Sequence, residues 1–270
     1  MIIVNRRIIG SLTLTLVLTL GQGALSAGPS SAAHAPIARA HVAHAPIAHA
    51  PITHASATLA PAYAYDESRC GNSSGRVLLT FDDWAYSDPR RATRIGEYLE
   101  DRGIRAAFFL IEEFAKEYPD IVPTLRRQGH WVANHTYSHQ LLTALTYEQA
   151  EQEIENGVHS DLLRPPYGSY GEREKSIADS LGYRMCLWTI DTLDWEEAGD
   201  GFRSVDSIRD RVRDAPSSAK RNGVVLGHLD YNYPDAVPGI IDDLEEDGYR
   251  LCRNDGAVGE KVPSPLDCAD

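Results

Sequence analysis

Short apolar runs recur along the chain beyond residue 70, and a glycine precedes several of them. Gly103, Gly129, Gly182 and Gly248 each follow a stretch of mixed polar and apolar residues that is typical of a helix. Because glycine tolerates the left-handed backbone conformation that ends helices, each marks a joint between a helix and a strand. The apolar runs that we interpret as strands are 77–81, 106–111, 131–134, 162–164, 185–190, 224–227 and 250–252.

Most of these runs are continuously apolar, as expected for parallel strands buried on both faces. Helices are predicted between them. One begins at Thr146, where Gln149 three residues later fits a capping box, and another covers residues 234–247. Strands alternating with helices indicate an α/β fold. About seven parallel strands favour a single domain built as a distorted, incomplete (β/α) barrel, with a doubly wound sheet as the alternative.

The N-terminus has the pattern of a secretory signal peptide. Arg6 and Arg7 precede an uncharged apolar run at 8–20, and small residues follow up to Ala27. The apolar run is short for a bilayer span. We therefore expect residues 1–27 to be removed on export, leaving no membrane span; an uncleaved anchor is the alternative.

A low-complexity segment follows the predicted signal peptide. It repeats His-Ala-Pro-Ile at 34–37, 44–47 and 49–52 and contains almost no acidic residues. Such a composition cannot bury enough apolar surface to offset its ordering entropy. Residues 28–69 are interpreted as an extended linker in or near a cell wall, with metal binding by the histidine-rich tract as the alternative, and residues 70–270 as the catalytic domain.

Charge narrows the classes of partner. The 270-residue chain carries a formal net charge of -13. A phosphate backbone or an anionic lipid surface requires a basic face, so nucleic-acid binding and electrostatic membrane docking are disfavoured. We expect a secreted monomer.

Four cysteines, Cys70, Cys186, Cys252 and Cys268, lie beyond the predicted signal peptide. An even number in an exported protein is typical of disulfides, and four cysteines allow three pairings. We favour a Cys252–Cys268 bond, since both lie near the C-terminus. Cys186 lies in an apolar run and is compatible with a buried free thiol instead.

Polar residues with catalytic chemistry follow five of the predicted strands. Asp82 and Asp83 follow the first strand and His135 the third; the others are Arg164, Asp191 and His228, at the ends of the fourth, fifth and sixth. Active sites of α/β barrels collect at the carboxyl ends of the strands. Five strands that end in this way indicate one shared site.

Two of these segments point to metal-assisted hydrolysis. One of the adjacent carboxylates at Asp82 and Asp83 can act as a metal ligand and the other as a base, although such a pair taken alone is more often a solvated turn. The i, i+4 spacing of His135 and His139 would place both imidazoles on one face of a helical turn. Two histidines and one carboxylate leave an open position for water, as catalytic zinc requires; with ten histidines in the chain, a chance pairing is the alternative.

The other three segments are weaker signals individually. Two prolines stiffen the turn after Arg164, which could hold that side chain against a carboxylate. The segment from Asp191 to Trp195 brings two acids and an aromatic residue that can stack on a sugar or cover the core. A lone histidine at a strand end, such as His228, is more often structural than catalytic.

In this order, the five segments resemble the polysaccharide deacetylases, the NodB-homology domain of carbohydrate esterase family 4. The resemblance covers roughly residues 76–250, and its ordered set of motifs is specific although each motif is modest. The matching segments are Thr-Phe-Asp-Asp at 80–83, His-Thr-x-x-His at 135–139, Arg-Pro-Pro-Tyr-Gly at 164–168, Asp-x-x-Asp-Trp at 191–195 and Leu-x-His at 226–228.

The resemblance implies a role for each matched residue. One divalent metal ion, usually Zn²⁺ in this family, with Co²⁺ as a substitute, would be bound by Asp83, His135 and His139. Asp82 would be the general base, and Arg164 would orient it. The remaining roles fall to the later motifs: His228 as general acid tuned by Asp191, Tyr167 as the oxyanion-binding backbone amide, and Leu226 and Trp195 as the lining of the acetyl pocket.

One position departs from the family pattern. Trp84-Ala85 stands where the family usually has Gly-Pro after the paired aspartates. Glycine there permits special backbone angles and close substrate approach, so we expect Trp84 to narrow the substrate groove or to add a stacking platform. The departure bears on the substrate more than on the chemistry.

The resemblance therefore implies a secreted, metal-dependent polysaccharide N-deacetylase, a hydrolase of non-peptide carbon–nitrogen bonds. Its expected substrate is acetylated polysaccharide or oligosaccharide of the peptidoglycan or chitin-like type. An acetylxylan esterase acting on O-acetyl groups and a non-catalytic carbohydrate-binding protein on the same fold are the alternatives. The binding protein is disfavoured because the base, the ligands and the acid are all present.

Overall fold

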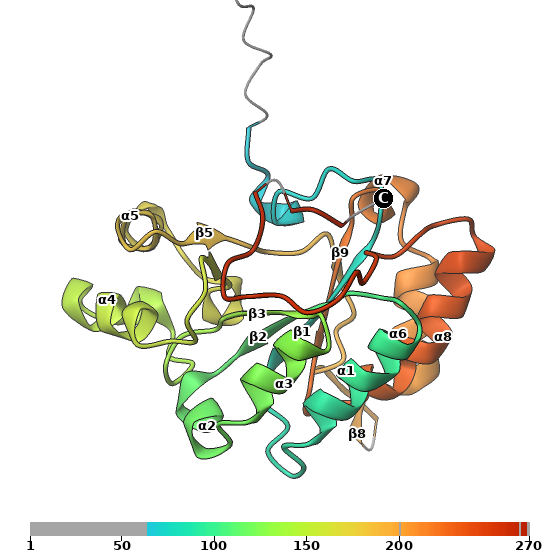
Figure 1. Cartoon of the computed structure of the whole chain (residues 1–270), viewed down its shortest axis with the longest axis horizontal. Coiled ribbons are helices and arrows are strands. Elements are labelled where there is room, and N and C mark those ends of the chain that lie inside the picture. Colours follow the sequence, from blue (N-terminus) through green and yellow to red (C-terminus); the bar gives the residue numbers. More distant parts are fainter. Residues whose placement is uncertain (1–63, 200, 265, 269–270) are drawn as a thin grey trace, which may run out of the picture. The chain divides into compact units, whose positions relative to one another are not determined.

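The computed structural model describes residues 64–199, 201–264 and 266–268. The predicted signal peptide and all but the last six residues of the predicted linker lie outside these residues. The described part contains one seven-stranded sheet in the order β5-β4-β3-β2-β1-β9-β6, in which every paired strand is parallel (Figure 1). The strands are β1 (Leu78–Asp83), β2 (Ala107–Leu110), β3 (Trp131–Asn134), β4 (Leu162–Leu163), β5 (Arg184–Met185), β6 (Ile190–Asp191) and β9 (Val224–His228).

The sheet curls but does not close. Strands β5 and β6 form its two edges, and the chain between them crosses from one edge to the other. The N–H of Cys186 donates to the Leu163 carbonyl beside β4, whereas the N–H of Thr189 donates to the Val224 carbonyl beside β9. This arrangement confirms the predicted distorted, incomplete barrel.

Two strand predictions need correction even though seven strands are found. The apolar run 185–190 is two short strands, β5 and β6, because it spans the gap between the sheet edges rather than pairing along its length. The run 250–252 is not a strand of the sheet. It contacts β1 through a single isolated bridge between Val77 and Leu251.

Helices follow the strands and cover the outer face of the sheet (Figure 1). The predicted role of the glycines at helix ends is confirmed, since Gly103, Gly129, Gly182 and Gly248 all have positive φ, between 66° and 82°. The segment after Gly248, however, is not the expected strand. The capping box is also confirmed, since the Thr146 hydroxyl accepts from the Gln149 N–H and the Gln149 side chain accepts from the Thr146 N–H. The α-helices are α1 (Arg91–Asp101), α2 (Glu112–Glu117), α3 (Ile121–Arg127), α4 (Tyr147–Glu155), α5 (Glu172–Ser180), α6 (Val205–Arg213), α7 (Ser217–Lys220) and α8 (Tyr233–Glu246).

The remaining elements are short. A two-stranded antiparallel hairpin of β7 (Glu197–Ala198) and β8 (Gly201–Phe202) precedes α6. Three 3₁₀ turns complete the described elements: η1 (Glu67–Arg69), η2 (Leu142–Ala144) and η3 (Pro166–Gly168).

Strand β1 explains how one run of residues serves both the core and the site. Leu79 and Phe81 belong to the cluster beneath the helices, where the Phe81 ring stacks on Phe108 with centroids 4.8 Å apart. Leu78 belongs to a second cluster, on the opposite face of the sheet. Because side chains alternate along a strand, Thr80 and Asp82 share the Leu78 side, so they enter the barrel interior.

Two disulfides join the described cysteines, Cys70 to Cys186 and Cys252 to Cys268. The predicted Cys252–Cys268 pair is confirmed, and the alternative of a free thiol at Cys186 is wrong. Residues 64–69, assigned from the sequence to the linker, contact the domain: the Tyr65 hydroxyl donates to the Met185 carbonyl at 2.8 Å. Within the described residues, no helix combines the length and apolar character that a membrane span requires.

Candidate active site

A cavity of about 500 Å³ opens at the carboxyl ends of the strands. Its walls contain most of the predicted site residues: Asp82, Asp83, His135, His139, Tyr167, Asp191, Trp195, Leu226 and His228. The parallel register brings the ends of β1 and β9 together, since Asp82 is the partner of His228 across the sheet. The sequence prediction of one shared site at this edge agrees with this arrangement.

Three side chains form a compact set that suits one divalent cation. The Asp83 Oδ1 atom lies 3.2 Å from His135 Nε2 and 3.1 Å from His139 Nε2, and all three ligand atoms lie within 4.8 Å of one another. Asp83 Oδ1 is buried and has no hydrogen-bond partner among the described residues. A buried carboxylate oxygen without a partner is costly unless something binds it. One carboxylate and two imidazoles are a donor set of catalytic zinc sites, so these residues fit the expected metal.

The loop that carries the two histidines is not helical, which corrects the predicted helical turn. Thr136 and His139 have φ values of 67° and 60°, which bring the imidazoles together by turning the backbone twice. Side chains hold this shape. The Asn134 Oδ1 accepts from the Thr136 N–H at 2.6 Å, and Glu153 of α4 accepts from the N–H and hydroxyl of Ser138 at 2.9 and 2.7 Å.

Hydrogen bonding selects which nitrogen of His135 faces Asp83. The His135 Nδ1 lies 2.8 Å from the Arg164 carbonyl and donates to it, which leaves Nε2 directed at Asp83. Burial opposes ionisation of Asp83, but the two imidazoles hold its pKa well below its usual value. Burial also opposes protonation of His135, while Asp82 and Asp83 raise its pKa. Binding of a cation must therefore displace protons from this cluster.

Asp82 is held by a fully buried arginine. Arg164 Nη1 donates to Asp82 Oδ1 at 2.6 Å and to the Thr80 hydroxyl at 2.8 Å. Its Nε and Nη2 donate to the carbonyls of Cys186 and Leu187 at 3.0 and 2.8 Å. Burial lowers the pKa of Arg164 and the Asp82 carboxylate opposes that effect. The arginine thus fixes one carboxylate oxygen and leaves the other, Oδ2, 3.7 Å from His135 Nε2.

The partner of His228 is Asp194, which corrects the expectation that Asp191 tunes this histidine. The two oxygens of Asp194 lie 2.8 Å from His228 Nδ1 and 2.8 Å from its backbone N–H. Asp191 lines the cavity, but its Oδ1 accepts from the Leu193 N–H. Burial disfavours the charged imidazolium, yet the Asp194 hydrogen bond and the charges of Asp194, Asp83 and Asp82 raise the pKa of His228 to about 9. His228 is therefore protonated at neutral pH.

Trp84 does not line the substrate groove, which corrects the expectation from the sequence. Its side chain is 2 % exposed and packs in the core beneath the helices, against Phe114 and Tyr118 at centroid distances of 6.3 and 5.9 Å. Asp83 has a φ of 68°, so the chain turns sharply there and directs the next side chain inward. Trp84 thus anchors the turn that carries Asp83.

Other aromatic residues line the cavity. Trp195, which the resemblance placed at the acetyl pocket, lies in its wall and is 46 % exposed. Tyr167, from which only a backbone amide was expected, also lines it and is 68 % exposed. Tyr86, Trp188 and Tyr231 also line it and were missed from the sequence. Trp188 lies inside the apolar run that we interpreted as one strand, and Tyr86 follows Trp84 by two residues. The sequence signal that could have identified either of them as a cavity residue was an aromatic side chain near a motif.

Comparison with known proteins agrees with this geometry. A family model described as polysaccharide deacetylase matches residues 71–186. The peptidoglycan-N-acetylglucosamine deacetylase of Bacillus cereus is 32 % identical over 201 residues, which cover 70 % of each chain. A chitooligosaccharide deacetylase of Rhizobium leguminosarum bv. trifolii is 32 % identical over 173 residues, covering 61 % of this chain and 75 % of that protein.

A solved structure gives the same result for the fold. The family 4 carbohydrate esterase from Streptomyces lividans in complex with acetate has a TM-score of 0.57 to this chain and 28 % sequence identity. The match covers 69 % of this chain and 98 % of that one. The described domain therefore contains nearly the whole of that esterase fold.

Proposed function

The chain belongs to the polysaccharide deacetylase family, and on this premise we propose that it is a secreted, metal-dependent N-deacetylase. Its substrate would be an N-acetylglucosamine polymer of the peptidoglycan or chitin-like type. The observation that carries the proposal is the completeness of one cavity: a candidate base, a protonated acid and a three-residue ligand set all face it. A relative that only binds carbohydrate has no need of this combination.

Asp83, His135 and His139 would hold the cation. A divalent ion there would supply Lewis acidity toward the acetyl carbonyl and the attacking water. Asp82 takes the proton from that water, because its free oxygen faces the same side of the cavity as the ligands. Arg164 orients Asp82 through its hydrogen bond to Oδ1, and the Tyr167 backbone amide is the proposed donor to the oxyanion.

His228 completes the reaction by protonating the leaving group. An amine anion is too basic to depart, so an amide substrate needs an acid as the tetrahedral intermediate collapses. Asp194 supplies that acid by keeping His228 charged at neutral pH. An alkoxide needs this help less, which is why we favour N-acetyl over O-acetyl substrates. Trp195, with nearly half of its surface exposed at the cavity, offers a face on which a sugar ring can stack.

A direct competition tests the substrate class. Purified protein with Zn²⁺ would be offered an N-acetylglucosamine oligomer and acetylated xylan together, and acetate and free amine would be quantified. We expect amine from the oligomer. Acetate from xylan alone would replace the proposal with the acetylxylan esterase, and carbohydrate binding that survives chelation without any acetate release would favour a binding protein.

Export is part of the same proposal. It is supported by the signal-peptide pattern of residues 1–27 and by two disulfides, which persist in oxidising compartments. Mass spectrometry of the secreted protein should find an N-terminus near Ala27 or Gly28. An intact N-terminus retained in the membrane would show that the segment is an anchor.

A further inference from the structure

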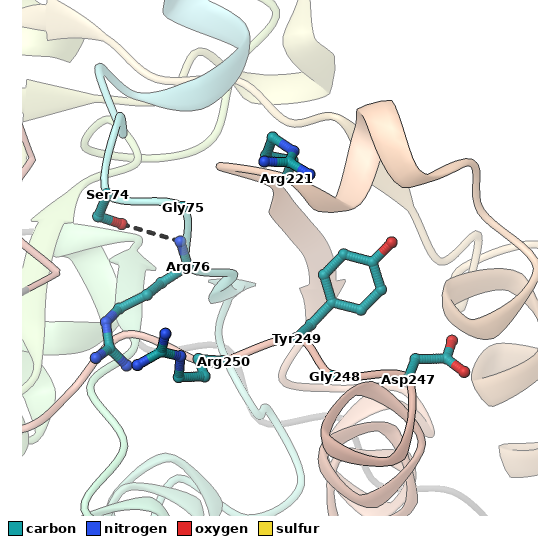
Figure 2. A pocket seen from close by; sticks show the side chains of 8 residues that line it. All are labelled: Ser74, Gly75, Arg76, Arg221, Asp247, Gly248, Tyr249 and Arg250. Carbon is teal, nitrogen blue, oxygen red and sulfur yellow. Dashed lines mark hydrogen bonds between the residues drawn. The ribbon is translucent and has the colours of Figure 1, made fainter.

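A second cavity, of about 380 Å³, lies at the opposite end of the sheet from the candidate active site. Its wall is built by the residues before β1, the residue Arg221 before β9, and the turn after α8 (Figure 2). These are the amino ends of the strands whose carboxyl ends carry Asp82 and His228. At about 3.3 Å per residue, the length of β1 separates the two cavities by roughly 20 Å.

Three arginines, Arg76, Arg221 and Arg250, line this cavity, and among the described residues none of them forms an ion pair with a carboxylate. Asp247 is the one acidic residue of the lining, and it is already paired, because its Oδ2 lies 3.1 Å from the ammonium of Lys220. The cavity therefore carries uncompensated positive charge in a chain whose net charge is -13.

Two of the arginines lie next to each other because of the backbone. The N–H of Val77 donates to the Arg250 carbonyl at 2.8 Å, and Val77 and Leu251 form a parallel bridge. Arg76 and Arg250 precede these two bridged residues, and Figure 2 shows both on one side of the cavity, with Arg221 above them. Like charges held side by side repel each other, so an anion between the two guanidinium groups would reduce that repulsion.

The donors available favour a phosphate group over a carboxylate. Arg76 uses Nη1 to bond the Leu251 carbonyl at 3.0 Å, and a guanidinium has five N–H donors, so most of its donors are left for a ligand. A carboxylate is planar, and two N–H donors of a single guanidinium group satisfy both of its oxygens. A phosphate presents several oxygens in different directions and more negative charge, which suits three guanidinium groups around one space.

We infer that this cavity is a binding site for a phosphate group, most simply one carried by a phosphodiester-linked polymer. Because the cavity faces away from the candidate active site, a polymer bound there would leave the cavity between Asp82 and His228 open. The site would hold the protein on an anionic surface while the candidate active site, at the other end of the barrel, binds a neutral sugar chain. It does not depend on the proposed deacetylase activity.

The test compares the full chain with a double variant, Arg221→Gln/Arg250→Gln. Both side chains are exposed and neither side chain makes a hydrogen bond or ion pair among the described residues, so folding should be preserved. The charge control is Arg94→Gln/Arg127→Gln, which removes the same charge from exposed guanidinium groups on α1 and α3 and breaks only the surface contacts of Arg94 with Asp88 and of Arg127 with Thr124. Binding of inorganic phosphate would be measured by calorimetry, and binding of poly(glycerol phosphate) and of polygalacturonate by co-sedimentation at fixed salt.

We expect the unmodified chain and the control to bind poly(glycerol phosphate) and the double variant to bind it at least about tenfold more weakly. Binding of inorganic phosphate without the polymer would support the site with the free ion as its ligand. Equal binding by the double variant, or equal affinity for polygalacturonate at matched charge, would overturn the inference. Acetate release from a soluble oligosaccharide should be the same in all three proteins, which separates this result from failure of the proposed function.

Discussion

Replacing Asp194 by asparagine should move the alkaline limit of activity. In the unmodified protein, the Asp194 carboxylate hydrogen-bonds His228 and helps raise the pKa of the imidazole to about 9. The amide of Asp194→Asn carries no charge, so it removes the largest favourable influence on the imidazolium while leaving the burial that disfavours it. The pKa of His228 should then fall to its ordinary value of 6.5 or lower.

The size of the effect follows from the fraction of His228 that is protonated. A general acid is active below its pKa, so the rate should be lost as the pH rises through about 9 in the unmodified protein. At pH 8 a group with a pKa of 9 is about 90 % protonated and one with a pKa of 6.5 about 3 %, so the variant should be roughly 30-fold slower. At pH 6 the variant is still about 75 % protonated, and the difference should nearly vanish.

The assay is the pH dependence of kcat/KM for release of acetate from an N-acetylglucosamine oligomer, with Zn²⁺ present. The matched control is Asp191→Asn, because Asp191 lines the same cavity but its carboxylate accepts from the Leu193 N–H. Its alkaline limit should stay near that of the unmodified protein. A nuclear magnetic resonance titration of the His228 ring reports the pKa directly and distinguishes a shifted proton from a damaged fold. An unchanged limit in Asp194→Asn, or a shift confined to Asp191→Asn, would refute the assignment of Asp194.

Three further predictions concern the base, the metal and the core. Asp82→Asn removes the base and should lower turnover by roughly 10²–10⁴, while metal content should stay near one ion per chain because the three ligands are intact. Turnover at the wild-type level would show that Asp82 has a structural role instead. Chelation should abolish activity, and Zn²⁺ or Co²⁺ should restore it. Metal affinity measured by competition should fall with acidification, because a proton on His135 competes with the cation; full activity of a metal-free variant with alanine at both His135 and His139 would disprove the ligand set. Trp84→Ala should lower the free energy of unfolding by about 3–5 kcal/mol in denaturant titration, and a loss below 1 kcal/mol would contradict its burial.

Much of the fold could be read from the sequence because it depends on local interactions. A glycine that ends a helix needs only its own backbone freedom, so the joints at Gly103 and Gly182 were predictable, as was the capping box at Thr146. The same holds for the ends of β1 and β9. Parallel strands place their carboxyl ends at one edge, so Asp82 and His228 had to lie near each other once both strands were recognised.

Contacts between distant segments could not be read in this way. The motif at 191–195 offers two aspartates, and only the turn at Leu193, with a φ of 53°, decides that Asp194 reaches His228 while Asp191 bonds back to the turn. Trp84 was expected at the groove because it stands where the family usually has glycine, yet the backbone turn at Asp83 places it in the core.

The run 185–190 shows most clearly which features follow from local sequence and which depend on the folded protein. Its apolar composition predicts burial, and burial is what the sequence by itself determined. Whether it becomes one strand or two depends on where the sheet stops, since Cys186 bonds to one edge and Thr189 to the other. The gap that this segment spans is a property of the whole curled sheet. No window of sequence contains it, because the residues on its two sides, Leu163 and Val224, lie far apart in the chain and meet only in the folded protein.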